Sequence, residues 1–313
     1  MTPVTVRVPA KVNLQLSVGP PKADGYHDLV TVFHAVSLFD EVTVAPADRT
    51  SVGVTGEDAA RVPSGRANLA VRAARALASA ARRRQDSSAV RIEIRKRIPV
   101  SAGLAGGSAD AAAALVACNE LWQAGLSLGE LREIAASVGS DVAFTLLGGT
   151  AVGQGRGERL TAALTSGTYH WVLAFASGGL PTPEVYATCD RLRAARAAGA
   201  ASGAVPQPEL DTGLMAALRS GDPAAVGPLL SNDLQAAAVS LRPDLRRTLA
   251  AGREHGALGA VVSGSGPTCA FLAADARRAR ELAVSLSGAG VCRAVAPVQG
   301  PAPGAAVLAG ERG

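Results

Sequence analysis

The first hundred positions are dominated by an alternation of hydrophobic and polar residues. Valines occupy alternate positions from 4 to 8, and after Pro9 the alternation resumes over positions 12–18. A period of two is typical of a strand, so we expect one or two strands interrupted at Pro9. The same reasoning predicts strands over 30–36, 41–45, 90–94 and 150–152. On the strand after Pro9, Lys11 and Asn13 share the face opposite the apolar side chains.

Helical spacing appears at 68–83 and again after Ser127. Ser127 and Glu130 have the spacing of a capping box, and Gly139 is a helix stop, so a helix should run to about Val138. Beyond position 160 we expect strands over 171–175, 257–263, 268–272 and 291–298. Helices should cover 187–201 and 276–287, with a connecting loop over 202–211. Strands and helices mixed without strict alternation predict an α+β fold with two layers per domain.

A glycine-rich stretch, PVSAGLAGGSADAAAA, begins at Pro99 and leads into a run of alanines. Because a strand precedes it and alanine favours helix, the order is strand, glycine turn, helix start. Such a junction directs free backbone N–H groups and the positive end of a helix at one point, which suits a phosphate. No lysine follows Gly107, so this is not the common GxxxxGK[ST] phosphate loop. Taken alone, the stretch is equally consistent with a tight strand-to-helix turn.

Composition narrows the class of protein. The chain has 313 residues and a net charge of +5, and only three of its 31 basic residues are lysines. The basic runs are too short for a nucleic-acid stripe, and the positive field favours small anionic molecules. The four cysteines lack ligand spacing and indicate free thiols in a reducing compartment. With no signal-peptide pattern and no long apolar run, we expect a cytoplasmic chain with no membrane or nucleic-acid partner.

Four further features admit both a structural and a chemical interpretation. Asp141, in GSD at 139–141, is by itself most simply the N-cap of a helix over 142–147. Lys11 alone would be a solvated strand lysine, and SGSGPT at 263–268 alone would be a hairpin turn. The pair Tyr26 and His27 sits in a loop, where surface packing is the more common role.

Together these pieces resemble one enzyme superfamily. PAKVNLQLSVG near the start, PVSAGLAGGSADAAAA in the middle and VVSGSGPTCAF near the end match, in order, the three motifs of the GHMP kinases. ADGYHDLVTVFHAV, ANLAVRAARAL, NELW, GSDVAF and LPTPEVY resemble the branch that acts on 4-diphosphocytidyl-2-C-methyl-D-erythritol. The resemblance spans roughly residues 4–298.

The resemblance implies a two-domain fold and a reaction. The fold has an N-terminal domain like domain 2 of ribosomal protein S5 and a smaller C-terminal α+β domain. We assign these to residues 1–160 and 161–299, with a loose tail at 300–313. The implied reaction is ATP- and Mg²⁺-dependent phosphorylation of the 2-hydroxyl of the methylerythritol unit, a step of non-mevalonate isoprenoid biosynthesis. The substrate is expected between the domains.

The resemblance also implies roles for individual residues. Asp141 corresponds to the catalytic base and Lys11 to the lysine beside it. The ATP site would comprise Asn68 and Lys96 near the adenosine, the turn Pro99, Val100, Ser101, Ala102, Gly103, Leu104, Ala105, Gly106, Gly107, Ser108 and Ala109 around the phosphates, and Gly264, Ser265 and Gly266 from the C-terminal domain. The cytidine substrate would be bound by Asn13, Tyr26, His27, Thr182 and Tyr186. No second acidic residue is assigned to Mg²⁺.

One departure and two alternatives remain. Relatives carry more glycine in the central turn, where this chain has Ser101, Ala102 and Ala105; we expect these three to keep negative φ, since positive φ would strain them. Another small-alcohol kinase with the same ATP turn is the first alternative. A non-catalytic RNA-binding module is the second, and the joint presence of Lys11, Asp141 and both glycine motifs argues against it.

Overall fold

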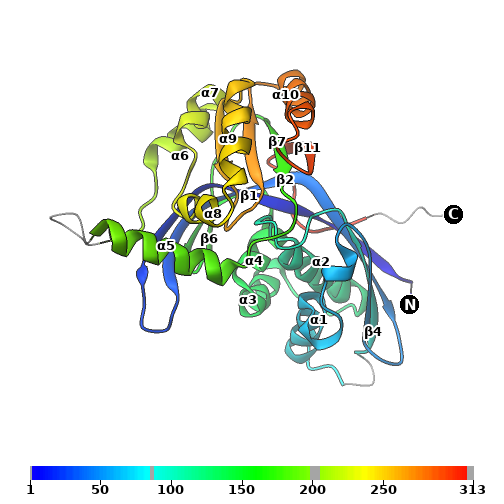
Figure 1. Cartoon of the computed structure of the whole chain (residues 1–313). Coiled ribbons are helices and arrows are strands. Elements are labelled where there is room, and N and C mark those ends of the chain that lie inside the picture. Colours follow the sequence, from blue (N-terminus) through cyan, green and yellow to red (C-terminus); the bar gives the residue numbers. More distant parts are fainter. Residues whose placement is uncertain (1, 85–87, 198–204, 309–313) are drawn as a thin grey trace.

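The computed structural model describes residues 2–84, 88–197 and 205–308. Two sheets organise these residues (Figure 1). The larger sheet has the order β12-β1-β2-β4-β3, with β5 paired to β2, β6 to β5 and β8 to β1. Its strands are β1 (Val4–Pro21), β2 (His27–Pro46), β3 (Ser51–Gly56), β4 (Val90–Lys96), β5 (Thr150–Gly155), β6 (Arg159–Ala162), β8 (Ser231–Asn232) and β12 (Ala306–Val307). The α+β class predicted from the sequence is confirmed.

Four helices accompany the larger sheet. They are α1 (Leu69–Ala80), α2 (Gly106–Leu121), α3 (Leu128–Val138) and α4 (Ser140–Leu147). Helix α2 contacts β1, β2, α1 and α4, so it is the central helix of this layer. Its alanines are buried almost without exception, which allows a close approach to the sheet. The capping box predicted at Ser127 is present, with Glu130 as the reciprocal partner.

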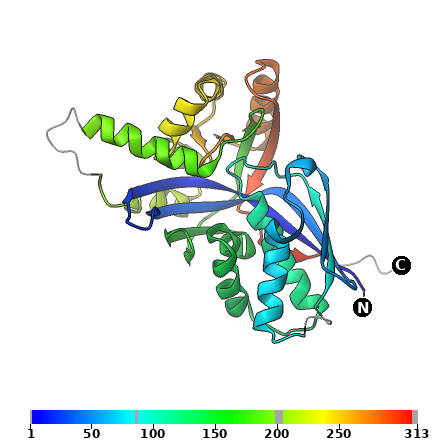
Figure 2. The same cartoon turned by 60° about the horizontal axis from the view of Figure 1, so that its bottom comes forward.

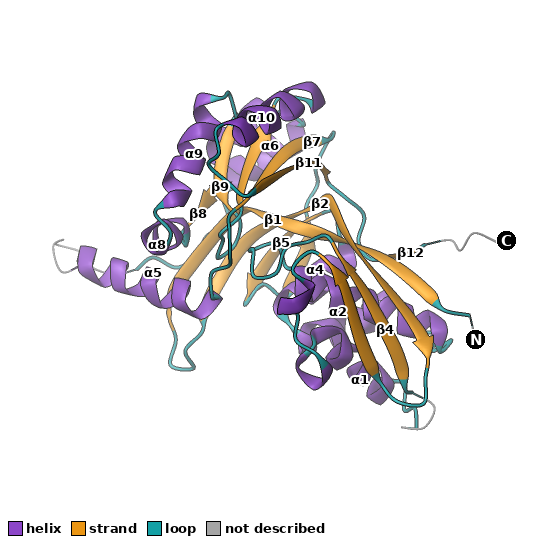
Figure 3. Ribbon diagram, turned by 45° about the vertical axis from the view of Figure 1, so that its right-hand side comes forward, coloured by secondary structure: helices purple, strands orange, loops and turns teal. Residues whose placement is uncertain are grey.

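The smaller sheet has the order β11-β7-β10-β9 and is antiparallel throughout. Its strands are β7 (Tyr169–Phe175), β9 (Gly259–Val262), β10 (Cys269–Ala273) and β11 (Ala294–Gly300). The helices of this part are α5 (Thr182–Ala197), α6 (Thr212–Ser220), α7 (Pro223–Val226), α8 (Gln235–Leu241), α9 (Asp244–Glu254) and α10 (Ala276–Gly288). In Figure 3, β7, β9 and β11 of this sheet lie beside α9 and α10, apart from β4, α1 and α2.

The long hairpin of β1 and β2 joins the two groups. In Figure 2 it crosses between the α1–α3 side and the α5 side. Its far end supplies Leu16 and Val18 to a hydrophobic cluster of the C-terminal half, whereas Val6 and Val8 lie in a larger cluster that also includes Trp171 and Leu272 of the smaller sheet. The β1–β2 hairpin therefore packs against both halves of the molecule.

Several sequence expectations need correction. Of the one or two strands expected around Pro9, the structure has one, because a register shift between Pro9 and Ala10 absorbs the proline that was expected to interrupt it. Helix α5 begins at Thr182, five residues earlier than expected, and the expected end at 198–201 lies outside the described residues, as does 202–204 of the expected loop. Helices α6, α7, α8 and α9 were not anticipated.

The tail expected to be loose from Gly300 is ordered as far as Leu308. Ala302 N donates to Ala35 O and Ala305 N donates to Thr145 O, and β12 pairs with β1. These backbone hydrogen bonds attach the segment to the larger sheet and to α4. Residues 309–313 lie outside the described part. Within the described residues, no helix combines the length and apolar character that a membrane crossing requires.

A buried histidine links acid stability to this fold. His34 on β2 is fully buried, its Nδ1 lies 2.8 Å from Thr150 Oγ1, and its ring packs against Tyr169 and Trp171. Burial lowers the pKa of His34 to about 3. The unfolded chain takes up this proton near pH 6.5 while the folded chain does not, so stability present at neutral pH is lost on acidification.

We expect the free energy of unfolding to fall by about 2 kcal/mol when the pH is lowered from 7 to 5, because His34 is protonated only in the unfolded chain. Urea unfolding of the native protein and of His34→Asn at both pH values measures it. The variant should lose less stability than the native protein over this interval, whatever its stability at pH 7. The exposed His255→Asn is the matched control, and an equal pH dependence in all three proteins would contradict the assignment.

Candidate active site

A cavity of about 1450 Å³ lies where the β1–β2 hairpin, the glycine turn, α4 and α5 face one another. It exceeds the roughly 300–1,000 Å³ of an ordinary single-ligand pocket, so there is room for two ligands of nucleotide size. Most of the residues predicted for the site line it: Lys11, Asn13, Tyr26, His27, Ser101, Ala102, Gly103, Ala105, Gly106, Gly107, Ser108, Asp141, Thr182, Tyr186, Gly264 and Ser265.

A lysine and an aspartate converge in this cavity. Lys11 Nζ lies 3.9 Å from Asp141 Oδ2 and donates to Asn13 Oδ1 (2.6 Å) and to Gly103 O (3.0 Å). Asn13 is itself held, because its Nδ2 donates to Thr31 Oγ1 at 2.8 Å. The lysine side chain is 4% exposed and the aspartate side chain 30% exposed. The ammonium is therefore fixed in place while the carboxylate remains open to a ligand.

Burial sets the electrostatics of the pair. Desolvation lowers the pKa of Lys11, and the negative charge of Asp141 acts against that shift. Asp141 stands in the first turn of α4, where the positive helix end favours a carboxylate. It is not the N-cap that the sequence alone suggested, since that position belongs to Gly139. Its side chain therefore makes no capping hydrogen bond and can contact a ligand.

The glycine turn leads into α2 in a strained conformation. Ser101 has φ 53° and Ala105 φ 60°, so the expectation that both keep negative φ is wrong; Ala102 is not among the residues with positive φ. Each left-handed residue with a Cβ costs roughly 1–2 kcal/mol. The first helical hydrogen bond runs from Ala109 N to Ala105 O, so the amides of Gly106, Gly107 and Ser108 precede it. They are free to bind an anion at the helix start.

The second glycine motif joins β9 to β10 and packs against the first, backbone on backbone. Ser263 Oγ donates to Gly103 O at 3.0 Å, and a Cβ on Gly103 would lie 2.0 Å from Ser263 O. A Cβ on Gly264 would lie 3.0 Å from Lys11 Nζ. Asn232 Nδ2 donates to Val262 O and Gly264 O, which holds this hairpin in place. The hairpin interpretation is correct, and the hairpin also closes over Lys11.

An aromatic group occupies the α5 end of the cavity. The rings of His27 and Tyr186 lie 5.1 Å apart, and the Arg156 guanidinium lies 3.7 Å from the centre of the Tyr26 ring. His27 Nε2 lies 3.0 Å from Asp190 Oδ1. Because an ionised carboxylate only accepts, the His27 proton lies on Nε2 and leaves Nδ1 as an acceptor in the neutral ring. Burial raises the pKa of the Tyr186 hydroxyl, so it stays protonated.

Asp190 and Arg156 were missed by the sequence analysis. Asp190 follows Tyr186 by four residues on α5, so helical spacing from a predicted site residue could have found it. Arg156 follows β5 and contacts Asp24 as well as Tyr26, and no local pattern indicates this. Thr182, by contrast, was predicted; its Oγ1 lies 2.9 Å from Ser265 Oγ.

Seven predicted ATP-site residues do not line the large cavity: Asn68, Lys96, Pro99, Val100, Leu104, Ala109 and Gly266. Asn68 caps α1, accepting from Ala70 N and donating to Pro63 O. Lys96 is buried between Asp40 and Asp110. Burial raises the pKa of Asp110, and the attraction of the Lys96 ammonium opposes that shift. The structure gives both Asn68 and Lys96 internal partners, and their place near adenosine stays a prediction.

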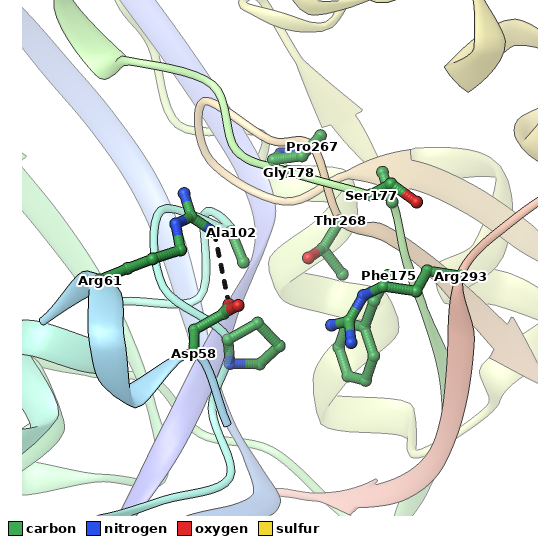
Figure 4. Close-up of a pocket in the computed structure, with 11 residues that line it drawn as sticks. Asp58, Arg61, Ala102, Phe175, Ser177, Gly178, Pro267, Thr268 and Arg293 are labelled. Carbon is green, nitrogen blue, oxygen red and sulfur yellow. Dashed lines mark hydrogen bonds and ion pairs between the residues drawn. The ribbon is translucent and has the colours of Figure 1, made fainter. Parts of the chain in front are cut away.

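A second, smaller cavity of about 120 Å³ lies behind the glycine turn (Figure 4). Asp58 and Arg61 approach it from the N-terminal half, and Thr268 and Arg293 from the C-terminal half. Asp58 Oδ2 accepts from Val100 N and pairs with Arg61. Ala102 lines both cavities, so the turn forms the wall between them.

Comparison with known proteins identifies relatives of the whole chain. Residues 68–149 match the family described as GHMP kinases N terminal domain, and residues 214–292 match GHMP kinases C terminal. The 4-diphosphocytidyl-2-C-methyl-D-erythritol kinase of Nocardia farcinica is 56% identical, covering 98% of this chain and 97% of its own. That of Thermobifida fusca is 54% identical, covering 98% and 99%.

Solved structures agree with this result. A crystal structure of 4-(cytidine 5'-diphospho)-2C-methyl-D-erythritol kinase has a TM-score of 0.74 at 34% identity and covers 94% of this chain and 98% of its own. A mevalonate kinase from L. major, in complex with R-mevalonate, has a TM-score of 0.72 at 16% identity and covers 96% of each chain, which shows a shared fold.

Proposed function

The chain belongs to the 4-diphosphocytidyl-2-C-methyl-D-erythritol kinases within the GHMP kinase family, and on that premise we propose a reaction and a site for it. It transfers the γ-phosphate of ATP to the 2-hydroxyl of 4-diphosphocytidyl-2-C-methyl-D-erythritol, in isoprenoid precursor biosynthesis. The observation that carries the proposed site is the convergence of Lys11 and Asp141, 3.9 Å apart, inside a cavity that also contains the start of α2.

Asp141 acts as the general base. Its carboxylate accepts the proton of the 2-hydroxyl as the new O–P bond forms and the bond from the γ-phosphorus to the bridging oxygen of ADP breaks. The Lys11 ammonium offsets the negative charge that develops on the transferred group. Asn13 and Gly103 O support this role, because their contacts hold the ammonium at one point.

The ATP phosphates lie at the start of α2. The free amides of Gly106, Gly107 and Ser108 form the positive N-terminal end of α2, which attracts a phosphate. Such binding matters because phosphoryl transfer depends mainly on positioning the reactants and on neutralising phosphate charge. Gly264 and Ser265 close the site from the C-terminal half. Ser101, Ala102, Gly103 and Ala105 also line the cavity beside the phosphates. Pro99, Val100, Leu104 and Ala109 do not line it and shape the backbone of the turn.

The donor set around the turn fits a Mg²⁺ ion carried chiefly by the nucleotide. Among the described residues no group of three His, Cys, Asp or Glu could hold a metal. Mg²⁺ commonly retains several waters and uses few protein ligands beside phosphate oxygens. We assign the hydroxyl of Ser108, which lines the cavity at the start of α2, as one such ligand. Bound there, the ion would neutralise phosphate charge, and Asp141 would remain available for the substrate proton.

The cytidine end of the substrate lies against Tyr26, His27 and Tyr186. The two tyrosines offer ring faces for stacking, and the Nδ1 acceptor of His27 suits the exocyclic amine of cytosine, which donates. Asn13 and Thr182 line the path from the base toward Lys11 and Asp141. The free cysteines among the described residues agree with a cytoplasmic location.

The test of the reaction is ADP release with 4-diphosphocytidyl-2-C-methyl-D-erythritol, compared with mevalonate and homoserine under the same conditions. We expect turnover with the cytidine substrate and little with the other two. Equal or faster turnover of mevalonate or homoserine would contradict the proposed substrate, and ATP-independent RNA binding without turnover would contradict the kinase itself.

We expect Tyr186→Ala to raise the KM of the cytidine substrate about 5- to 150-fold, because one stacked base is worth roughly 1–3 kcal/mol. The KM of ATP should stay near its native value, since Tyr186 lies at the α5 end of the cavity. Tyr186→Phe retains the ring and is the matched control. A native substrate KM in Tyr186→Ala would place the base elsewhere.

A further inference from the structure

A buried group of three charged residues lies beneath the glycine turn. Lys96, the last residue of β4, donates from Nζ to Asp40 Oδ2 and to Asp110 Oδ2. Asp40 is 0% exposed, and Lys96 and Asp110 are 3% exposed. None of the three lines the large cavity. Any effect they have on a nucleotide in that cavity therefore passes through the backbone that they hold.

Asp40 holds the start of the turn. Its Oδ1 accepts from Arg97 N at 2.6 Å and from Ile98 N at 2.9 Å. Asp40 itself belongs to β2, which pairs with β4 immediately before the turn. Two consecutive amides are thus anchored to the sheet at the point where the chain leaves the strand.

Asp110 and Lys96 hold the end of the turn. Asp110 lies in the second turn of α2, and a Cβ on Gly106 would be 3.1 Å from Lys96 Nζ. The ammonium therefore rests against the first residue of α2 and pairs with the fifth. Together with Asp40, this contact fixes residues 97–110 at both ends, and that segment contains all the amides assigned to the phosphates.

Stability alone does not account for these charges. A buried ion group is often no more stable than apolar side chains of similar volume, because desolvation opposes the attraction between the charges. Asp110 Oδ1 is also buried and has no hydrogen-bond partner among the described residues, which adds to that cost. The group instead supplies directional hydrogen bonds, which connect one strand, one turn and one helix.

We propose that Asp40, Lys96 and Asp110 are positioning residues for the ATP phosphates, holding the turn and the start of α2 in register without touching the nucleotide. This inference rests on the proposed seat of the phosphates at Gly106–Ser108. It assigns Lys96 a part in ATP binding different from the expected contact with adenosine.

The first experiment is steady-state kinetics of Asp110→Asn with ATP and the cytidine substrate varied separately. Asparagine keeps an acceptor for Lys96 but loses the ion pair. We expect the KM of ATP to rise between about tenfold and a hundredfold, and the KM of the cytidine substrate to stay within about twofold. A native KM for ATP, or equal rises for both substrates, would overturn the inference.

A triple variant, Asp40→Asn with Lys96→Met and Asp110→Leu, separates positioning from stability. The three new side chains are uncharged and have nearly the length and branching of those they replace, so the thermal midpoint should stay near that of the native protein. We expect its KM for ATP to be raised nonetheless. A triple variant with a native KM for ATP would show that the charges are dispensable to binding.

A third variant, Gly107→Val, tests the proposed phosphate seat at Gly106–Ser108 separately from this inference about the three buried residues. Gly107 is exposed and lines the cavity, and its Cβ would meet only Leu69 at 3.4 Å, so the fold should tolerate valine. If Gly107→Val raises the KM of ATP and the two charge variants do not, the seat stands and the inference falls. If Gly107→Val leaves the KM of ATP unchanged, the seat falls, and the inference with it.

Discussion

We expect Asp141→Asn to lower kcat about 100- to 10,000-fold, the usual contribution of a general base. Asparagine has the same shape but cannot take the proton of the 2-hydroxyl. The side chain is partly exposed and caps no helix, so the fold should survive with a loss of only about 0.3–1 kcal/mol at the helix start. Measurements of kcat for phosphoryl transfer, together with a thermal melt, test both parts.

A double-mutant cycle with Lys11→Met refines this result. Lys11 acts partly through Asp141, so the losses of the two single variants should not add in the double variant. Fully additive losses would mean that the two groups act independently. Near-native rates in both single variants would refute the assigned roles altogether.

The second large effect is expected at the contact between the two glycine motifs. Gly103→Ala places a Cβ 2.0 Å from Ser263 O, so the turn and the hairpin must move apart. Gly103 O also holds Lys11 Nζ, and a displacement of about 1 Å can cost roughly a hundredfold in rate. We therefore expect kcat/KM to fall about a hundredfold, as measured by ADP release.

Gly178→Ala is the control for backbone strain. Gly178 and Gly103 both have φ 76°, but a Cβ on Gly178 meets nothing within 4 Å. The control variant bears the same left-handed strain without the collision and should retain near-native activity. Equal losses in both variants would assign the effect to strain, and native activity in Gly103→Ala would show that the two motifs need not touch.

Local patterns predicted the strands, the capped helix and the glycine turn because each rests on neighbouring residues. The alternation after Pro9 located β1, and Ser127 with Glu130 located the start of α3. Local patterns could not predict how far a strand continues or which distant segment pairs with it. A bulge at Pro9 lets β1 run through the proline, and pairing to β1 orders a C-terminal segment that composition alone describes as loose.

The candidate site shows the same difference between what local sequence patterns could predict and what they could not. The residue types for proton transfer were recognisable, but the approach of Lys11 to Asp141 depends on how α4 packs beside the hairpin. Asp190 and Asp40 were missed since each partner lies on a different element, His27 on the hairpin and Lys96 on β4. Ser101 and Ala105 adopt positive φ because the surrounding packing overrides their intrinsic preference.

The pairing of β12 with β1 has a consequence for biosynthesis of the chain. The strand that completes the edge of the N-terminal sheet follows the whole smaller sheet in the sequence, and the same segment hydrogen-bonds to Thr145 on the helix that carries Asp141. During synthesis the N-terminal half therefore lacks this strand and its contact with α4 until the smaller sheet has also been made. The surroundings of Asp141 are completed only after that point.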